Sequence, residues 1–453
     1  MRVIGATRRA VLFSGMAAAT AGVLGGCGGA TAQQPAAQTL QPATVEWRHL
    51  ASSDAVLQRW GDFGNDVKAA LAEKKVTVNL NFESTQMWEK LQVEFAGGAG
   101  PDVVYNQVSW VIPGGVRGIF LQLDDLVKRD KIKRESYSAG AWDSWVWKNK
   151  QYAMAYSGFG ECVFLYKKLF TESNVALPKL DWTWDEFLDV AKKLTKGTEL
   201  QKQFGVVLFH GGDWQLTGSS WMLNNGGKVL SDARDKALFG DDAKSIQAFE
   251  WLTDLRLRQG VEPKTTERTP APTAANPAAT AQPMNEGRAA MEIARFSRYS
   301  EWIQQLGSGN VEIYPLPAGP AKRRTHAVGT NAWSVGGMSK VKDAAWEVVK
   351  WLTGPGGQTG KGGRVVPFPS LLAGGTSPEF LSQYAGTKLK DVVDAWAKDS
   401  HDYMVNPDST EMNPIFNKHS TAAFNGEKTA RQALRDAQDE INVVFGRRPA
   451  DLR

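Results

Sequence analysis

Between residues 45 and 105 the hydrophobic spacing alternates between two periods. Residues 76–82 place apolar and polar side chains at alternate positions, which predicts a half-buried strand. Residues 54–72 carry apolar side chains at near-helical spacing, and residues 45–49 predict a strand before them. A second helix is predicted for residues 85–95 and a short buried strand for residues 102–105. This β-α-β-α-β order predicts a parallel α/β layer.

The alternation of periods continues along the chain. Thr183 and Glu186 have the spacing of a capping box, which predicts the start of a helix, and Thr429 with Gln432 predicts another. Further elements follow from the same periods: helices at residues 245–258 and 341–352, and strands at residues 289–294 and 311–314. Residues 264–283 are dominated by Thr, Ala and Pro and are predicted to be a surface loop. A chain of 453 residues with this pattern is expected to be an α/β protein of two domains.

The first 43 residues have a different character. Arg8 and Arg9 form a twin-arginine pattern, and an uncharged stretch ends in small residues just before Cys27. This arrangement resembles a bacterial lipoprotein signal with cleavage before Cys27 and lipid on its sulfur. Residues 1–26 are therefore expected to be a signal peptide, and the uncharged residues 27–43 a flexible tether to the extracytoplasmic face of the cell membrane. The alternatives are a plain secretory signal or a transmembrane helix, for which the stretch is short against a hydrocarbon core of about 30 Å.

Charge and rare residue types exclude several functional classes. The formal net charge of +5 includes three arginines of the leader, and without the leader 50 basic and 48 acidic residues remain. A nucleic-acid-binding surface is therefore not expected. With Cys27 lipidated, Cys162 is the other cysteine of the chain, so neither an intrachain disulfide nor a cysteine-ligated zinc site is expected. The five histidines lack metal-ligand spacing, and no metal or cofactor is expected.

Tryptophan is the unusual residue of this chain. There are 17 tryptophans, and many stand beside Gly, Asn or Asp. Most must fill the core of so large a chain. Some can line a cleft instead, because an aromatic face matches the C–H face of a pyranose and polar neighbours match its hydroxyl rim. The composition therefore favours a sugar-binding cleft.

Several separated segments follow one another in a recognisable order. They are residues 100–104 (Gly-Pro-Asp-Val-Val), 118–125, 152–157, 165–170, 182–187 (Trp-Thr-Trp-Asp-Glu-Phe), 224–227, 287–291 (Gly-Arg-Ala-Ala-Met), 315–320 and 433–438. Together they resemble extracellular solute-binding proteins of the sugar-binding type (family 1), the maltose-binding-protein-like lipoproteins of ABC importers. The resemblance covers most of residues 44–446. One departure is Lys167, where the family usually has Asn.

The resemblance implies an α/β, two-lobed periplasmic-binding-protein-like fold of class II type, with a ligand cleft between the lobes and three inter-lobe crossovers. Residues 44–155 and 328–364 would form the first lobe, and residues 156–327 and 365–453 the second. The implied function is that of a substrate-binding lipoprotein and not of an enzyme. It would bind a mono- or oligosaccharide in an aromatic-lined cleft and deliver it by hinge closure to the permease subunits of an ABC transporter. The protein is expected to be a monomer.

Two alternatives stay open. The same fold can bind another solute, such as glycerol phosphate, a polyamine or a peptide, and Arg295, Arg298 and Arg364 would suit a phosphate. An exported carbohydrate-active enzyme would use a similar cleft, but it needs two carboxylates roughly 5 to 10 Å apart. The chain shows no nucleophile elbow, metal triad or phosphate loop.

The candidate ligand contacts of the first lobe follow strand ends, because α/β sheets bind ligands at the carboxyl ends of their strands. These candidates are Ser53, Asp54, Trp88, Asn106, Gln107 and Trp110. Ser53 or Asp54 can instead cap the following helix, and Trp88 can face the core.

The remaining candidates lie in the second lobe and at the presumed crossovers. They are Tyr156, Asp213, Trp214, Trp221, Phe296, Tyr299, Asn331, Trp333 and Arg364. An acid beside a ring, as at residues 213–214, suits a sugar. Tyr156 and its neighbour Ser157 stand at the first presumed crossover, so either a hinge or a ligand role is open. Trp221 fits a core position as well, and Arg364 fits a surface ion pair.

Overall fold

The computed structural model describes residues 40–50, 54–83, 86–137, 139–198, 202–208, 214–264, 267, 283, 284, 286–359, 368–449 and 452. The predicted signal peptide, Cys27, Ser53, Asp213 and Arg364 lie outside the described residues, as does most of the predicted loop at residues 264–283. Within the described residues, no helix is long and apolar enough to cross a membrane.

The predicted β-α-β-α-β start of the fold is confirmed. Strands β1 (Ala43–Leu50), β2 (Val76–Glu83) and β3 (Val103–Asn106) are parallel, with β1 in the middle. Helices α1 (Asp54–Ala72) and α2 (Met87–Ala96) connect them. Helix α1 buries one stripe of side chains, Trp60, Phe63, Val67 and Leu71. The helical period read from the sequence therefore corresponds to a buried face.

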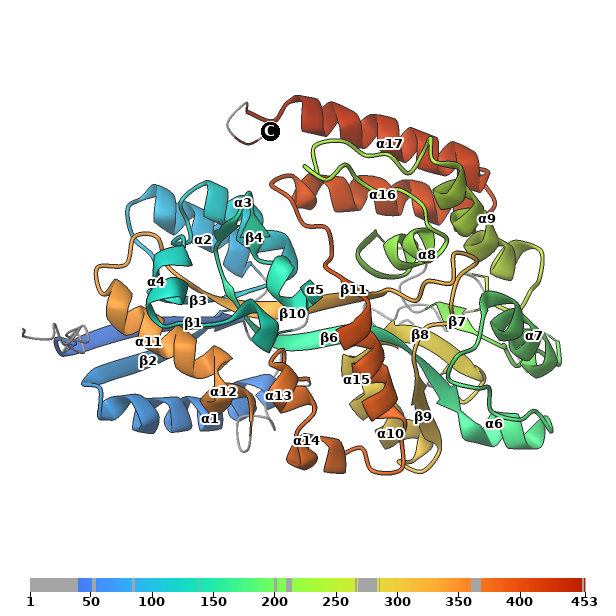
Figure 1. Ribbon diagram of the computed structural model, residues 1–453, viewed down its shortest axis with the longest axis horizontal. Helices are drawn as coiled ribbons and strands as arrows, with labels where there is room; N and C mark the ends of the chain where they lie inside the picture. The colour runs from blue at the N-terminus through green and yellow to red at the C-terminus, as the bar shows by residue number, and fades with distance from the viewer. Residues whose placement is uncertain are drawn as a thin grey trace, which may run out of the picture. The chain divides into compact units, whose positions relative to one another are not determined.

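Two long strands continue this sheet into a second half. Strand β10 (His326–Val335) is antiparallel to β3 on one side and to β6 (Met154–Tyr166) on the other. The second half adds β7 (Val207–Leu208), β8 (Met291–Arg295), β9 (Val311–Tyr314) and β11 (Ser400–His401). The strand order is β2-β1-β3-β10-β6-β8-β7, with β9 beside β6 and β11 beside β10 (Figure 1). We call the β1–β3 half the first lobe and the β7–β9 half the second lobe.

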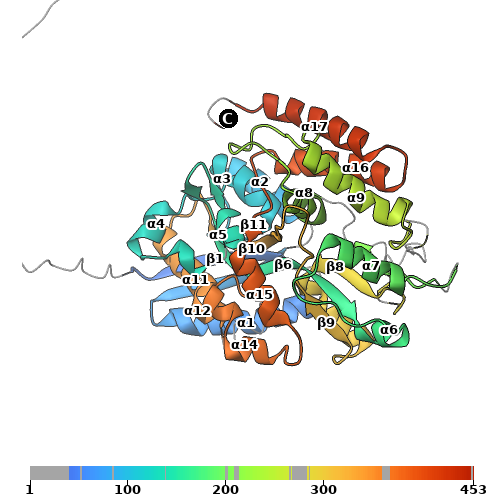
Figure 2. The same ribbon diagram turned by 45° about the vertical axis from the view of Figure 1, so that its right-hand side comes forward.

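Helices cover both faces of this sheet (Figure 1). In the first lobe α1 and α11 lie on one face and α2 and α3 on the other. In the second lobe α8, α9, α16 and α17 lie on one face and α10 and α15 on the other, and Figure 2 shows the same layers after rotation. The remaining helices and short strands are α3 (Val108–Val116), α4 (Asp124–Arg129), η1 (Arg134–Ser136), α5 (Ala139–Asp143), β4 (Val146–Trp147), β5 (Lys150–Gln151), α6 (Lys167–Glu172), α7 (Trp184–Leu194), η3 (Trp214–Gly218), α8 (Ser219–Asn224), α9 (Ala243–Leu257), η5 (Phe296–Arg298), α10 (Tyr299–Leu306), α11 (Lys342–Thr353), α12 (Pro355–Gln358), α13 (Leu372–Gly375), α14 (Pro378–Ser382), α15 (Leu389–Lys398), α16 (Ser409–Phe424) and α17 (Ala430–Gly446).

Both predicted helix caps are present. The Thr183 hydroxyl accepts a hydrogen bond from Glu186 N (3.3 Å), and Thr183 N donates to the Glu186 carboxylate (2.7 Å), which completes the capping box. At α17, the Thr429 hydroxyl accepts from Gln432 N (3.1 Å). The caps satisfy N–H groups that the first turn of a helix leaves without partners.

Three passages of the chain cross between the lobes side by side. Asn331 of β10 lies opposite Ser157 of β6, and a β-bulge follows at Ala332. On the other side of β6, Gly158 N donates to Phe368 O (2.7 Å), and Pro369 pairs with Ser157. The pairing places three crossovers next to one another, which is the arrangement implied by the family resemblance.

Aromatic rings clamp the crossing strands from both faces. A Cβ on Gly160 would lie 2.0 Å from the Trp396 ring, and a Cβ on Gly329 would lie 2.0 Å from the Tyr403 ring. Gly329 follows Val328, the partner of Gly160, so the two rings lie on opposite faces of the sheet. Glycine at these positions therefore allows the close approach of a ring to the backbone.

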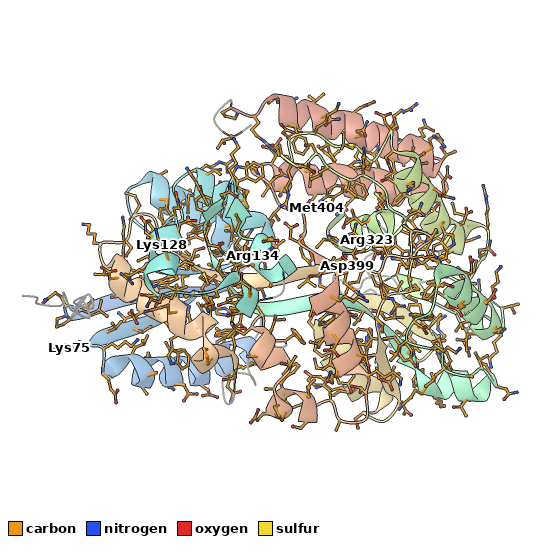
Figure 3. All side chains as sticks on the ribbon, in the orientation of Figure 1. Lys75, Lys128, Arg134, Arg323, Asp399 and Met404 are labelled. Atoms are coloured by element: carbon orange, nitrogen blue, oxygen red, sulfur yellow. The ribbon has the colours of Figure 1, made fainter. Side chains whose placement is uncertain are left out.

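The short strand β11 pairs with the start of β10, at His326 and Ala327. His326 N donates to Asp399 O (3.2 Å), and the Arg323 guanidinium pairs with the Asp399 carboxylate at 3.2 Å (Figure 3). The chain then leaves β11 through residues 402–408 and enters α16. This route carries Tyr403 onto the crossing strands.

Candidate binding site between the lobes

Three polar residues occupy adjacent strands where the sheet passes from one lobe to the other. Asn106 ends β3 and lies opposite Ala332 of β10, the neighbour of Asn331. Asn331 in turn lies opposite Ser157 of β6. Asn106, Asn331 and Ser157 therefore occupy three adjacent strands at one point of the sheet. Two of them, Asn106 and Asn331, are residues that the sequence predicted as ligand contacts.

The burial of these groups gives the site its chemistry. Asn106 is fully buried, and its Nδ2 donates to Val104 O (3.3 Å), whereas its Oδ1 has no hydrogen-bond partner among the described residues. The Ser157 hydroxyl is 1% exposed and has no partner there either. A buried polar group without a partner costs about 1–3 kcal/mol. Two such oxygens at the crossing strands are hydrogen-bonding positions that a polar ligand can fill.

The second lobe adds charged and aromatic side chains to the same strands. Glu161 of β6 is fully buried, accepts a hydrogen bond from the Thr217 hydroxyl (2.9 Å) and lies opposite Arg295 of β8. The Arg295 guanidinium lies 5.7 Å from the centre of the Tyr403 ring. Glu161 and Tyr403 were not among the residues predicted from the sequence, and Arg295 was predicted only as a contact for a phosphate ligand. The available signal was an acid in the otherwise uncharged run of residues 152–166.

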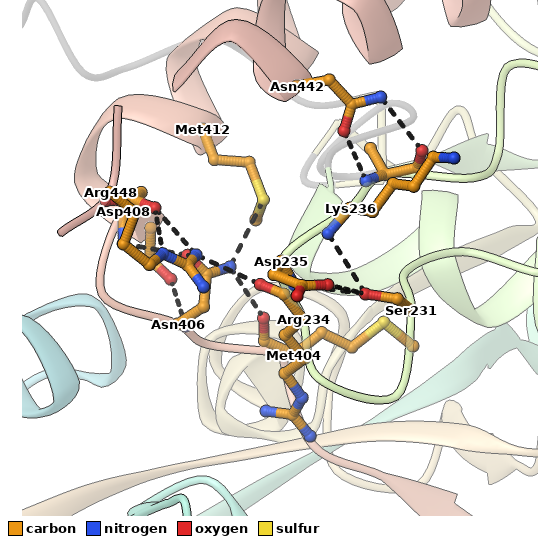
Figure 4. A network of polar contacts seen from close by, with 12 residues as sticks. Ser231, Arg234, Asp235, Lys236, Met404, Asn406, Asp408, Met412, Asn442 and Arg448 are labelled. Carbon is orange, nitrogen blue, oxygen red and sulfur yellow. Dashed lines mark hydrogen bonds and ion pairs between the residues drawn. The ribbon is translucent and has the colours of Figure 1, made fainter. Parts of the chain in front are cut away.

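A hydrogen-bonded loop holds Tyr403 in place. The preceding residue, Asp402, accepts two hydrogen bonds from Arg234, at 2.6 and 2.8 Å. On the other side, Asn406 Nδ2 donates to Met404 O (3.4 Å), and Asn406 Oδ1 accepts from Asp408 N (2.9 Å) (Figure 4). Bidentate Arg–carboxylate pairs fix geometry as well as charge. The ring of Tyr403 is therefore presented by a rigid segment.

Helix α16 presents a polar face towards α3 and η3. Asn417 Oδ1 accepts from Trp214 N (3.3 Å), and α16 contacts both α3 and η3. Asn413 lies one turn earlier on the same face, and its buried Oδ1 has no partner among the described residues. Neither asparagine was predicted from the sequence, although two amides four residues apart in one helix were a usable signal.

The first lobe contains a stacked indole pair. Trp88 of α2 and Trp110 of α3 have ring centres 5.8 Å apart at an interplanar angle of 11°. The two side chains are 8% and 9% exposed. Gln107 stands at the N-cap of α3 without a side-chain capping bond and is partly exposed. Trp110 and Gln107 thus follow β3 directly, beside Asn106, as the sequence predicted.

Most of the other aromatic candidates are packed against neighbouring rings. Trp333 is fully buried and is surrounded by five aromatic side chains, namely Trp47, His49, Trp60, Tyr105 and Tyr156. Tyr156 is 3% exposed and belongs to the same cluster. Neighbouring side chains pack against both rings, so neither ring has a face exposed to a ligand in this conformation.

The second-lobe aromatics fall into three further clusters. Trp214 packs on Phe239 and Phe416, Trp221 packs on Trp184 and Trp251, and Phe296 with Tyr299 packs on Tyr384. Trp214, Trp221, Phe296 and Tyr299 are between 0% and 6% exposed. Among the described residues, these rings therefore form separate packed clusters. Of the remaining candidates, Asp54 is the first residue of α1, and Ser53, Asp213 and Arg364 lie outside the described residues.

Two titratable groups near the crossover, Cys162 and His326, are buried, and burial favours the neutral form of each. Burial raises the pKa of the Cys162 thiol well above its usual value, and burial lowers the pKa of His326 to about 3. The described residues contain no group of three or more His, Cys, Asp or Glu side chains arranged to hold a metal ion. The arrangement is that of a binding site of amides, hydroxyls and one buried acid.

Comparison with known proteins gives the class to which this fold and site belong. The profile of the bacterial extracellular solute-binding protein family matches residues 58–359, more than half of the chain, so the chain belongs to that family. The family consists of binding proteins.

Individual relatives are more distant. The erythritol/L-threitol-binding protein of Mycolicibacterium smegmatis is 22% identical over 372 residues, which cover 76% of this chain and 75% of the relative. The cyclic α-maltosyl-1,6-maltose binding protein of Arthrobacter globiformis has a TM-score of 0.73 at 18% identity and covers 89% of this chain and 99% of its own. The sugar-binding protein MalE of Xanthomonas citri has a TM-score of 0.72 at 17% identity, with 89% and 98% covered. The structural matches establish the two-lobed fold.

Proposed function

We propose that this protein binds a carbohydrate, a mono- or oligosaccharide, between its lobes and delivers it to the permease subunits of an ABC importer by hinge closure. The observation that carries the proposal is the position of Asn106, Ser157 and Asn331 at neighbouring points of three adjacent crossing strands, where two buried oxygens, Asn106 Oδ1 and Ser157 Oγ, have no partner among the described residues. Neutral amides and hydroxyls match the neutral hydroxyl groups of a sugar. The relatives named for erythritol, L-threitol and cyclic α-maltosyl-1,6-maltose support this ligand class.

The alternative of a phosphorylated solute is disfavoured by the acidic neighbours of Arg298 and Arg295. Arg298 lies 3.2 Å from the Glu292 carboxylate and 3.0 Å from that of Glu301, and its guanidinium lies over Trp302. Arg295 stands beside Glu161. Because acids stand beside both cations, the positive field that a phosphate needs is reduced there.

The membrane part of the proposal rests on the sequence. A signal peptide at residues 1–26, recognised by the twin-arginine route, would be cleaved before Cys27, and the lipid on Cys27 would hold the protein at the membrane. The uncharged tether of residues 27–43 would have an r.m.s. span of roughly 20–24 Å. The lobe boundaries near residues 155, 328 and 364, and a monomeric state, belong to the same proposal.

A thermal-shift screen of purified protein tests the function. Mono- and oligosaccharides and acyclic polyols are compared with glycerol phosphate, spermidine and peptides, because a ligand that binds only the native state raises the melting temperature by mass action. A sugar hit is then measured by calorimetry against the variant Asn331→Ala. We expect a loss of about tenfold in affinity, equivalent to about 1.4 kcal/mol. The matched control is Asn310→Ala, an exposed asparagine in the turn before β9.

The screen also separates the rival functions. Saturable binding with no change in the sugar after prolonged incubation supports a binding protein, whereas products detected by chromatography would identify an enzyme. A shift with glycerol phosphate, spermidine or peptide and none with any sugar would reassign the cargo. If Asn331→Ala bound the sugar with the same affinity as the parent protein, the sugar would not bind at the crossing strands.

A further inference from the structure

A cavity lies in the second lobe, away from the crossing strands. It has a volume of about 390 Å³ and lies between the start of α7, the middle of α9 and the loop at residues 318–322. In Figures 1 and 2, α7 and α9 lie on the side of the second lobe that is remote from α1 to α5. Its lining residues include Trp184, Asp185, Gln247, Trp251 and Lys322. The interlobe site and this cavity share none of the residues named above for the site.

One wall of the cavity is a rigid aromatic platform. Trp251 is partly exposed and stacks on the fully buried Trp221, with ring centres 4.8 Å apart at 17°. Trp184 lies 4.6 Å from Trp221 and 4.8 Å from Trp251. Rings held by other rings lose little freedom when a ligand binds. The indole of Trp251 is therefore a preformed surface for a flat apolar face.

The loop opposite is hydrogen-bonded to the start of α7. Trp184 N donates to Ala318 O (3.1 Å), and Ala318 N donates to Trp182 O (2.8 Å). Lys322 N donates to Gly319 O (2.8 Å), which closes a turn and places Lys322 in the left-handed region with φ of 55°. Both walls are thus fixed in position before any ligand arrives.

The rim is polar and balanced in charge. Asp185, Gln247 and Lys322 are exposed around the aromatic wall. Gln247 Oε1 accepts from Asn225 Nδ2 (3.1 Å), which orients the side-chain amide. One carboxylate and one ammonium group leave no net charge, so the rim favours a neutral ligand with several hydrogen-bonding groups over an anion or a polycation. The N-terminus of α7 contributes little, because its capping box and the Ala318 carbonyl occupy its first N–H groups.

We propose that this cavity is a second carbohydrate site, which takes one pyranose ring of a neutral sugar. The C–H face of the ring would lie on Trp251, and its hydroxyls would reach Asp185, Gln247 and Lys322. The proposal does not depend on the function assigned to the crossing strands. Binding at this cavity, which we call the outer cavity, would hold a sugar or a longer glycan on the surface of the second lobe, without closure of the lobes.

Fluorine NMR of protein labelled with 5-fluorotryptophan tests the proposal, with maltose as the probe and ribitol as a polyol that has no ring. The resonance lost in Trp251→Leu identifies Trp251. We expect maltose at about 10 mM, enough to fill a site with a Kd near 1 mM, to shift this resonance saturably, and ribitol to leave it in place. The titration is repeated in Asn331→Ala, so that the outer cavity is read separately from the interlobe site.

A second variant tests the cavity without replacing a packed ring, so that a folding defect does not explain its result. Gln247→Ala is expected to weaken the maltose effect on Trp251 by about 2- to 10-fold, the loss of one hydrogen bond. The matched control Gln259→Ala, an exposed glutamine just after α9, should leave it unchanged. No maltose shift of the Trp251 resonance, an equal shift with ribitol, or no effect of Gln247→Ala would overturn the proposal.

Discussion

The Arg448 guanidinium lies over the indole of Trp147, with its carbon 5.3 Å from the ring centre. Trp147 belongs to β4, which follows the first-lobe helices, whereas Arg448 comes directly after α17 in the second lobe. The arginine is 2% exposed and pairs with the Asp408 carboxylate at 2.8 Å (Figure 4). The cation–π contact therefore links the end of the described chain to the first lobe through the segment that leads to α16.

The Arg448 contact should be measurable as a coupling energy. Arg448→Ala is expected to lower the free energy of unfolding by about 3 kcal/mol, because it leaves Asp408 without its partner. A double-mutant cycle with Trp147→Leu should give a coupling of about 0.5–2 kcal/mol by urea denaturation. The control is Arg258→Ala, whose side chain is 77% exposed and should contribute about 0.5 kcal/mol or less. A coupling of zero would mean that the ring and the cation are adjacent without interacting.

Ser157→Ala should separate stability from binding. The Ser157 hydroxyl is buried without a partner among the described residues, so its removal should raise the free energy of unfolding of the empty protein by about 1 kcal/mol. The same change should weaken sugar binding by about tenfold, because the hydroxyl is then missing from the site. Chemical denaturation and calorimetry measure the two effects.

Ser144 provides the matched control. Its buried hydroxyl donates to Gly140 O (2.6 Å), so Ser144→Ala should destabilise the protein by about 1 kcal/mol and leave affinity unchanged. If Ser157→Ala instead destabilised the empty protein like Ser144→Ala, the hydroxyl would have a structural partner.

Gly329→Ala should disturb the clamp on the crossing strands. The added methyl group would lie 2.0 Å from the Tyr403 ring, and overpacking of this kind costs typically about 1–3 kcal/mol. Tyr403→Leu in the same chain should restore part of the loss, which a double-mutant cycle detects. Gly61→Ala serves as the control: no atom lies within 4 Å of its Cβ, and alanine within α1 should stabilise the helix by about 0.5–1 kcal/mol. Additive effects of Gly329→Ala and Tyr403→Leu would contradict the close contact.

Acid should destabilise the protein through its buried histidines. Burial lowers the pKa of His49 and of His326 to about 3, and burial also lowers that of His401, from an ordinary value of 6.5. Between pH 6.5 and about 3 the unfolded chain binds protons that the folded chain does not. Stability is therefore complete above pH 6.5 and falls as the pH decreases, by up to about 1.4 kcal/mol per pH unit for each histidine.

Substitution of one histidine should flatten this dependence. In His49→Phe, the slope of the free energy of unfolding between pH 6 and pH 4 should decrease by about one proton, measured by urea denaturation at each pH. His326→Gln should have an equal effect, and the double variant should show the sum. An unchanged slope in both single variants would place the acid sensitivity in the carboxylates.

The local elements of this protein are determined by the sequence itself. The period of residues 76–82 and the Thr183 capping box depend on contacts within one strand or one helical turn, so they could be predicted without knowledge of distant neighbours. The order of motifs also identified the family and the three crossovers, because each motif is local and only their succession is needed.

The placement of the aromatic rings was decided by the tertiary structure alone. Trp333 is enclosed by Trp47 and Trp60, almost 300 residues earlier, and Trp214 is enclosed by Phe416, about 200 residues later. A tryptophan beside polar residues has the same local sequence whether its ring lines a cleft or fills a core, and only long-range packing distinguishes the two.

Some residues of the candidate site could be predicted from the sequence, and others were decided by the tertiary structure. Asn106 and Asn331 were predictable as polar residues at strand ends, because that position is a property of the sequence near each of them. Their meeting with Ser157 depends on the register of β3, β10 and β6, strands that are far apart in the chain, and on the bulge beside Asn331. Glu161 and Tyr403 become part of the site for the same physical reason, since strand pairing and the packing of Tyr403 against Gly329 bring them to the crossing strands.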